Sequence, residues 1–120
     1  MSAYQRLVLE EVGGVTVVRF ADKKIIDPEV IEQLGGELLS LVEKDKRKNI
    51  LLNFSDVDFL NSATLNKLIS LEKRVRSTSG RMKISDLRPE LREVMSITRL
   101  DKLFDIRGSQ ADAMQAFEAP

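Results

Sequence analysis

The sequence predicts an α/β domain, in which helices pack on a mixed, mostly parallel sheet that begins with an antiparallel hairpin. Short apolar runs typical of strands alternate along the chain with longer segments whose apolar residues recur at helical spacing. Strands that alternate with helices favour right-handed crossovers and therefore parallel pairing. Near the N-terminus, a Gly-Gly pair separates two β-branched runs, which is typical of a hairpin turn. The predicted order is ββαβαβαβα, in a single domain over residues 1–120.

The hairpin and the first helix are predicted from their turn and cap residues. Gly13-Gly14 suits the turn before the β-branched run 15–20, because glycine adopts positive φ freely. Asp27-Pro28 marks a helix start, because Asp accepts hydrogen bonds from the first backbone N–H groups and Pro suits the first helical position.

The middle of the chain is predicted to hold the end of this helix, a central strand and a second helix. Gly35-Gly36 in the first helix indicates either close packing on the sheet or a mobile recognition segment. The apolar run 50–54, bounded by polar residues, predicts a central strand. The loop 55–60 follows, and Leu65 and Leu68 then begin the apolar stripe of the second helix.

The last third of the chain continues the alternation. Gly80 is predicted to be the left-handed residue just past the second helix. Residues 81–85 alternate with period two, which predicts a half-buried or edge strand. Pro89 opens a third helix, residues 103–106 suit a last short strand, and Ser109 begins a terminal helix with an acid three residues later.

Composition argues against most enzymes. The chain has no Cys and no His, which excludes thiolate nucleophiles, the usual zinc sites and the Ser-His-Asp arrangement. Its 19 basic and 19 acidic residues give no net field toward nucleic acid or an anionic membrane. No apolar run approaches the length of a membrane-spanning helix, and the N-terminus lacks the pattern of a signal peptide. We therefore expect a cytoplasmic binding or signalling domain.

Polar side chains gather where the central strand is predicted to end. In a sheet of this kind, the loops after the carboxyl ends of strands form the usual binding edge. Asn61 suits the cap of the second helix, and Ser62 would occupy its first turn. A phosphate on Ser62 would lie at the positive end of the helix dipole, near unpaired backbone N–H groups. Asp56 and Asp58 would add to the negative potential, so that a partner docking flat on this edge would be repelled.

Each of these signals has a simpler interpretation. Ser62 by itself is an ordinary small polar residue at a helix start. Asp56 and Asp58 suggest a metal pair, but magnesium normally requires a phosphate or several waters beside its carboxylates. Two basic groups fit either a binding patch or a solvated face: residues 44–49, as a candidate nucleic-acid patch, and Lys67, Lys73, Arg74 and Arg76, as a candidate partner-facing stripe.

The order and spacing of several segments resemble the STAS domain family, in particular the small bacterial anti-sigma factor antagonists. In that family an apolar strand leads into an acidic loop and then into Asp-Ser-Ser-Gly-Leu at the start of a helix. Residues 50–54, 56–60 and 61–65 occupy those places here. The resemblance runs nearly end to end, and its further matches are the strand 15–20, Asp27 with Leu34 seven residues later, the strand start 80–84, the segment 97–106, and Ala113.

The resemblance implies a signalling protein that is not an enzyme. Proteins of this family bind an anti-sigma factor that is also a serine/threonine kinase with an ATP-binding fold, and they sequester it while unphosphorylated. The kinase phosphorylates the first Ser of the motif, which aligns with Ser62, and a phosphatase resets the switch. No cofactor, metal, nucleic acid or membrane is expected to take part. The implied partner-binding residues are Asp27, Asp56, Asp58, Asn61, Ser62, Ala63, Thr64, Leu65 and Lys67.

Three positions of the motif differ from the family. Asn61 replaces Asp, which keeps the cap chemistry but removes one negative charge, and Ala63 replaces the second Ser. Thr64 replaces Gly and places a β-branched side chain where the family leaves the backbone bare. The resemblance therefore makes Ser62 the predicted phosphoacceptor and Thr64 the second candidate.

Two other functions stay open at this point. The first is a non-phosphorylated STAS scaffold in a signalling assembly, which predicts a stable complex that is insensitive to ATP. The second is a module that binds a nucleotide or another small ligand at the same edge, which predicts thermal stabilisation by that ligand. The sequence makes no prediction of the oligomeric state.

Overall fold

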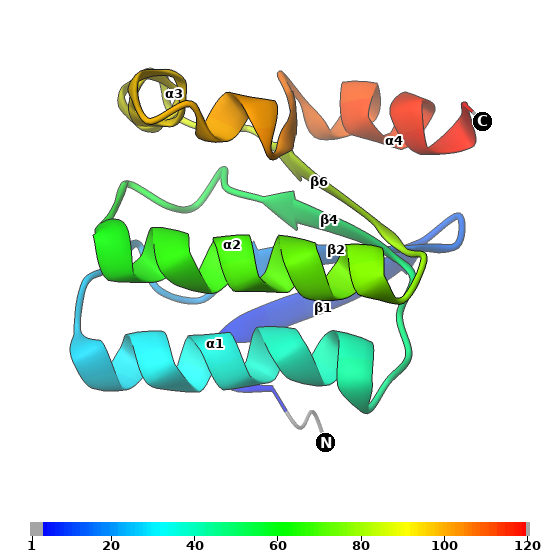
Figure 1. Ribbon diagram of the computed structural model, residues 1–120, viewed down its shortest axis with the longest axis horizontal. Helices are drawn as coiled ribbons and strands as arrows, with labels where there is room; N and C mark the ends of the chain where they lie inside the picture. The colour runs from blue at the N-terminus through cyan, green and yellow to red at the C-terminus, as the bar shows by residue number, and fades with distance from the viewer. Residues whose placement is uncertain (1–3, 120) are drawn as a thin grey trace.

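The computed structural model describes residues 4–119 and has the α/β architecture that the sequence predicts (Figure 1). Within this range, no helix is both long and apolar enough to cross a lipid bilayer. The elements in chain order are β1 (Leu7–Val12), β2 (Val15–Phe20), β3 (Lys24–Ile25), α1 (Pro28–Glu43), β4 (Asn49–Asn53), β5 (Phe59–Leu60), α2 (Ser62–Ser77), β6 (Arg81–Ser85), α3 (Pro89–Ile97), the 3-10 turn η1 (Leu100–Lys102), β7 (Asp105–Arg107) and α4 (Gln110–Glu118).

Both faces of the main sheet are covered by helices. Its five strands are ordered β1-β2-β4-β6-β7, with β1 antiparallel to β2 and the other pairs parallel. Figure 1 shows α1 and α2 side by side over one face. Alternation along β4 sends Ile50 and Leu52 into the core under these helices, whereas Leu51 packs with Ala113 and Phe117 of α4 on the other face. Because β4 is buried on both faces, its apolar run is continuous.

The predicted hairpin turn and first helix start are confirmed. Gly13 and Gly14 have φ angles of 54° and 81°, the positive values that a tight turn between twisted antiparallel strands requires. At the start of α1, the Asp27 carboxylate accepts a hydrogen bond of 2.9 Å from the backbone N–H of Glu29, and Pro28 is the first helical residue. These features depend on neighbouring residues alone, which is why the sequence predicts them.

β6 is an interior strand, and the prediction of a half-buried or edge strand is wrong. It lies between β4 and β7, and residues 82–85 are buried. The polar Lys83 of the alternating pattern is buried because its ammonium group bonds to Asp105, 2.6 Å away, and lies 5.0 Å from the ring centroid of Phe117. A polar side chain with such partners loses little free energy on burial. The alternation of polar and apolar residues in β6 therefore did not mark a solvent-exposed face.

The roles of two glycines differ from the predictions. Ser79, with a φ of 63°, takes the left-handed conformation after α2, and Gly80 does not. Gly80 is required for space instead, because a Cβ atom there would lie 2.5 Å from the carbonyl oxygen of Lys48. Gly35 also packs against α2, since a Cβ atom there would lie 2.7 Å from Cδ of Lys67.

A second, two-stranded sheet joins two segments for which the sequence predicted no strand. β3 runs parallel to β5, with Lys24 opposite Phe59 and Ile25 opposite Leu60. β3 directly precedes α1, and β5 directly precedes α2. This short pairing therefore holds the starts of the two helices next to each other.

Candidate functional site

The start of α2 carries the cap that the sequence predicts. The side-chain oxygen of Asn61 accepts a hydrogen bond of 3.1 Å from the backbone N–H of Thr64. Its amide nitrogen donates to the carbonyl oxygen of Ile26, 3.4 Å away. Asn61 thus satisfies one of the free N–H groups of the helix and fastens the helix start to the segment after β3.

The next two residues form an exposed first turn. Ser62 and Ala63 are both exposed. Their backbone N–H groups belong to the turn for which an α-helix has no acceptor of its own. The positive end of the helix dipole lies here, so an anionic group on the Ser62 hydroxyl would be in a favourable field.

The structure separates the two hydroxyl groups of the motif. Thr64 is only 1% exposed, and its hydroxyl group donates to the carbonyl oxygen of Ile25 at 2.9 Å. Leu65 is buried with the main core. Of Ser62 and Thr64, only Ser62 presents its hydroxyl group to solvent without first breaking buried contacts.

Asp56 and Asp58, in the loop before β5, are each matched by an arginine. Asp56 lies 3.9 Å from Arg19, and Asp58 lies 2.7 Å from Arg88 at the cap of α3. These exposed ion pairs offset part of the negative potential that the two carboxylates were expected to add beside Ser62. Among residues 4–119, no group of three or more acids comes together that could hold a metal ion.

Two of the basic residues of α2 cross-link this helix to α1. The Lys67 ammonium lies 2.9 Å from Glu32 of α1, and the Arg74 guanidinium lies 3.1 Å from Glu43 of the same helix. The stem of Lys67 also covers Gly35. Of the residues implied by the resemblance, the structure therefore gathers residues 61–65 at one edge, whereas Lys67 lies between the two helices.

The sequence reasoning missed the side chains that surround this edge. β3 and β5 have only two residues each, too few for periodicity to reveal them. Their pairing leaves Ile26 and Phe59 exposed beside the start of α2. Phe59, two residues before Asn61, and Ile26, directly before Asp27, were the only signals in the sequence.

Comparison with known proteins decides the family. The model of the STAS domain family matches residues 6–113, which is most of the chain. The chain belongs to the STAS domain family.

Related proteins carry names from the anti-sigma factor antagonists. The domain is 26% identical over 113 residues to BtrV of Bordetella bronchiseptica, described as a candidate anti-sigma factor antagonist, with 94% of this chain and 95% of that protein covered. An anti-sigma factor antagonist from Mycobacterium paratuberculosis is 25% identical, with a TM-score of 0.79 and coverage of 92% of this chain and 91% of that chain. The phosphorylated form of Bacillus SpoIIAA has the same fold, with a TM-score of 0.70, 17% identity, and coverage of 92% and 98%.

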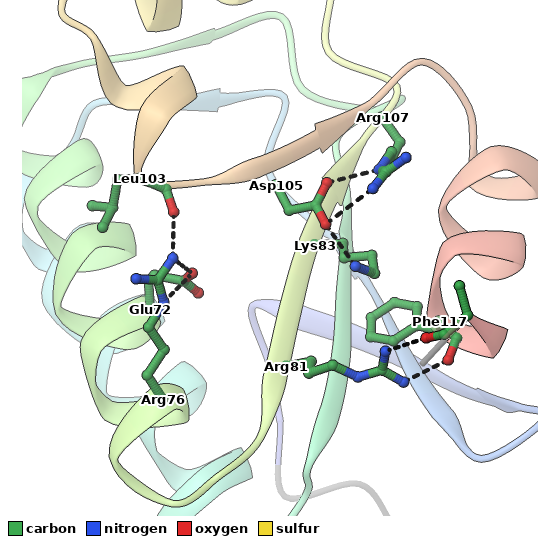
Figure 2. Close-up of polar contacts among 9 residues, drawn as sticks. Glu72, Arg76, Arg81, Lys83, Leu103, Asp105, Arg107 and Phe117 are labelled. Carbon is green, nitrogen blue, oxygen red and sulfur yellow. Dashed lines mark hydrogen bonds and ion pairs between the residues drawn. The ribbon is translucent and has the colours of Figure 1, made fainter.

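A second polar cluster of this STAS domain lies at the β6–β7 edge (Figure 2). The Lys83 ammonium and the Arg107 guanidinium both donate to Asp105, at 2.6 and 2.7 Å. On the other side of β6, Arg76 donates to Glu72 at 3.0 Å and to the carbonyl oxygen of Leu103 at 2.8 Å. These bonds fasten β7 and the turn before it to β6 and α2.

The two carboxylates of this cluster have pKa values shifted in opposite directions. Burial raises the pKa of Glu72, with Arg76 opposing the shift. For Asp105, burial also acts to raise the pKa, but hydrogen bonds from Arg107 and Lys83 outweigh it and lower the pKa below its ordinary value. Folding therefore favours the ionised form of Asp105 and the protonated form of Glu72.

Asp105 is expected to contribute to acid sensitivity. Because its pKa is lower in the folded state, its stabilising effect is present above the ordinary carboxyl pKa and is lost as the pH falls through the folded value. The Asp105→Asn variant should thus lose less stability than the parent between about pH 5 and pH 3. Urea unfolding at both pH values measures this difference. Asp101→Asn, a change at an exposed carboxylate, is the control. If Asp105→Asn loses as much stability as the parent between the two pH values, the lowered pKa of Asp105 is contradicted.

Proposed function

We propose that this STAS domain is an anti-sigma factor antagonist that acts in the cytoplasm by binding an anti-sigma factor with serine/threonine kinase activity and an ATP-binding fold. In the proposal, phosphorylation of Ser62 ends the binding and a phosphatase restores it. The domain binds and does not catalyse, in keeping with a chain that has no His and no Cys. The observation that carries the proposal is the exposed Ser62 hydroxyl group in the first turn of α2.

The location of Ser62 makes a switch possible without a change of fold. A phosphate would add a charge of about −1.5 to −2 at the positive end of α2. There the first-turn N–H groups can donate to it, so the folded state accepts the modification. A partner covering the same turn would have to desolvate this charge, which costs binding free energy. Phosphorylation would then act through the surface that the partner meets.

The burial of Thr64 favours Ser62 as the single phosphoacceptor. Transfer to Thr64 would require breaking its bond to Ile25 and exposing a side chain that is 1% accessible. The Thr64 side chain fills space beneath the helix start and leaves the outer surface of the turn to Ser62 and Ala63. The likeness to the phosphorylated form of SpoIIAA supports a fold that tolerates a phosphate.

Charge at residue 62 is expected to control partner binding. The partner to use is a purified anti-sigma factor kinase from the same cells, and calorimetry gives the dissociation constant. Ser62→Asp should weaken binding by at least about tenfold, because a negative charge is buried against the partner. Ser62→Ala should bind within about threefold of the parent, because a small truncation at an exposed position costs little.

A labelling experiment with ATP completes this test. The kinase should phosphorylate the parent at Ser62, located by mass spectrometry, and should not label Ser62→Ala. Ser70→Asp is the matched control, because Ser70 is also exposed on α2 and lies about two turns further on. A complex that forms equally well with Ser62→Asp and ignores ATP would indicate a scaffold and would overturn the proposed switch.

A further inference from the structure

The outward side of the β3–β5 sheet carries two large apolar side chains next to the exposed Lys24. Along each strand, successive side chains point to opposite faces. Ile25 and Leu60 are opposite each other and both are buried in the main core. The side chains before and after them in the pleat therefore point outward, and Ile26 and Phe59 are 45% and 52% exposed.

These two side chains form one patch. Lys24 is opposite Phe59 in the parallel register, so the residue after β3, Ile26, lies along the same outward face, diagonal to Phe59. Diagonal neighbours on one face of a sheet are within reach of an aromatic ring. We call this the Ile26–Phe59 face. Covering two large apolar side chains that lie close together in water would be favourable for a partner.

The Ile26–Phe59 face is continuous with the proposed phosphorylation site. Phe59 and Leu60 lead directly into Asn61, and the Asn61 amide donates to the carbonyl oxygen of Ile26. Ser62 is the next residue, in the exposed first turn of α2. A protein that encloses the Ser62 hydroxyl group must therefore also cover the surface beside it.

The charges around the face favour a protein over an anionic polymer or membrane. Lys23 and Lys24 border it on one side, and Asp27 and Glu29 border it on the other, all of them exposed. The two lysines and two acids balance, so the rim has no net positive charge to attract an anionic lipid surface or a nucleic acid. An apolar centre with a rim of both signs matches the anatomy of protein–protein interfaces.

We propose that the Ile26–Phe59 face is the apolar anchor through which the same anti-sigma factor docks, beside the charge switch at Ser62. The inference rests on the proposed function and specifies its partner surface. Phe59 supplies the aromatic side chain and Ile26 the aliphatic neighbour that an apolar pocket of the partner receives. The anchor provides affinity, and Ser62 provides control.

The test compares single and double alanine variants of this face. Binding to the purified anti-sigma kinase is measured by calorimetry for the parent, Ile26→Ala, Phe59→Ala and the double variant. We expect the double variant to bind at least about tenfold more weakly, since truncating a central apolar contact removes a large share of binding free energy. Val8→Ala is the matched control, because Val8 is 57% exposed on β1, at an edge of the main sheet. It should bind like the parent.

Thermal unfolding and phosphorylation kinetics separate the possible outcomes. The truncated side chains are half exposed, so the melting temperature should change little. In the kinase assay, phosphorylation of the double variant at Ser62 should show a higher KM than that of the parent and a similar kcat, because the anchor lies away from the reacting atoms.

Three results would count against the anchor. Unchanged binding of the double variant, together with loss of binding by Ser62→Asp, would overturn the anchor and leave the proposed function standing. Failure of the parent to bind the kinase would overturn both. A parent that dimerises in sedimentation while the double variant is monomeric would assign the face to a second copy, against this proposal.

Discussion

The Phe54→Ala variant is expected to lose about 3–5 kcal/mol in its free energy of unfolding. Phe54 is 0% exposed, and its ring centroid lies 4.8 Å from that of Phe20. It follows β4 directly, and its carbonyl oxygen accepts a hydrogen bond from Val57 in the loop that leads to β5. Removing the ring leaves a cavity that the surrounding β-sheet and helices cannot fill, because both remain tied by their own hydrogen bonds.

Urea unfolding monitored by circular dichroism measures this loss. Phe59→Ala is the matched control: the same substitution, five residues along the chain, removes a ring that is 52% exposed. We expect it to cost less than about 1 kcal/mol. Equal losses for the two variants would contradict the assignment of Phe54 to the core and of Phe59 to the surface.

The Gly80→Ala variant is expected to lose about 1–3 kcal/mol through overpacking. The new Cβ atom would lie 2.5 Å from the carbonyl oxygen of Lys48 and 3.2 Å from that of Val75. Both oxygens are held in place, since Arg81 donates its N–H to Lys48 at 2.7 Å and Gly80 donates its own to Val75 at 2.9 Å. Backbone atoms of this kind cannot turn away as a flexible side chain would, so the strands β4 and β6 must move apart.

Gly36→Ala tests the opposite sign under the same conditions. Gly36 is exposed in α1, and a Cβ atom there would meet nothing within 4 Å. The substitution is expected to raise the free energy of unfolding by about 0.5–1 kcal/mol, because alanine loses less backbone entropy in a helix. If Gly80→Ala were also neutral or stabilising, the close approach of the backbone at Gly80 would be refuted.

The sequence by itself determined the features that depend on near neighbours. The hairpin turn follows from Gly13-Gly14, and the start of α1 follows from the cap chemistry of Asp27 with Pro28. The two-sided burial of β4 follows from its continuous apolar run. Turn preference, capping and apolar period act within a few residues, so they are visible along the chain. The location of Ser62 in the first turn of α2 is also a feature that depends on near neighbours.

Only the tertiary structure decided which of these residues are exposed and which are paired. Thr64 is buried because its hydroxyl group meets the carbonyl oxygen of Ile25, far away in the sequence. Asp58 is matched by Arg88 of another element, which reduces the charge that it was expected to place beside Ser62. The Ile26–Phe59 face exists because β3 and β5 pair across a whole helix and a strand. Contacts of this kind join segments that are distant in the chain, and no local pattern records which distant partner the fold brings to a residue.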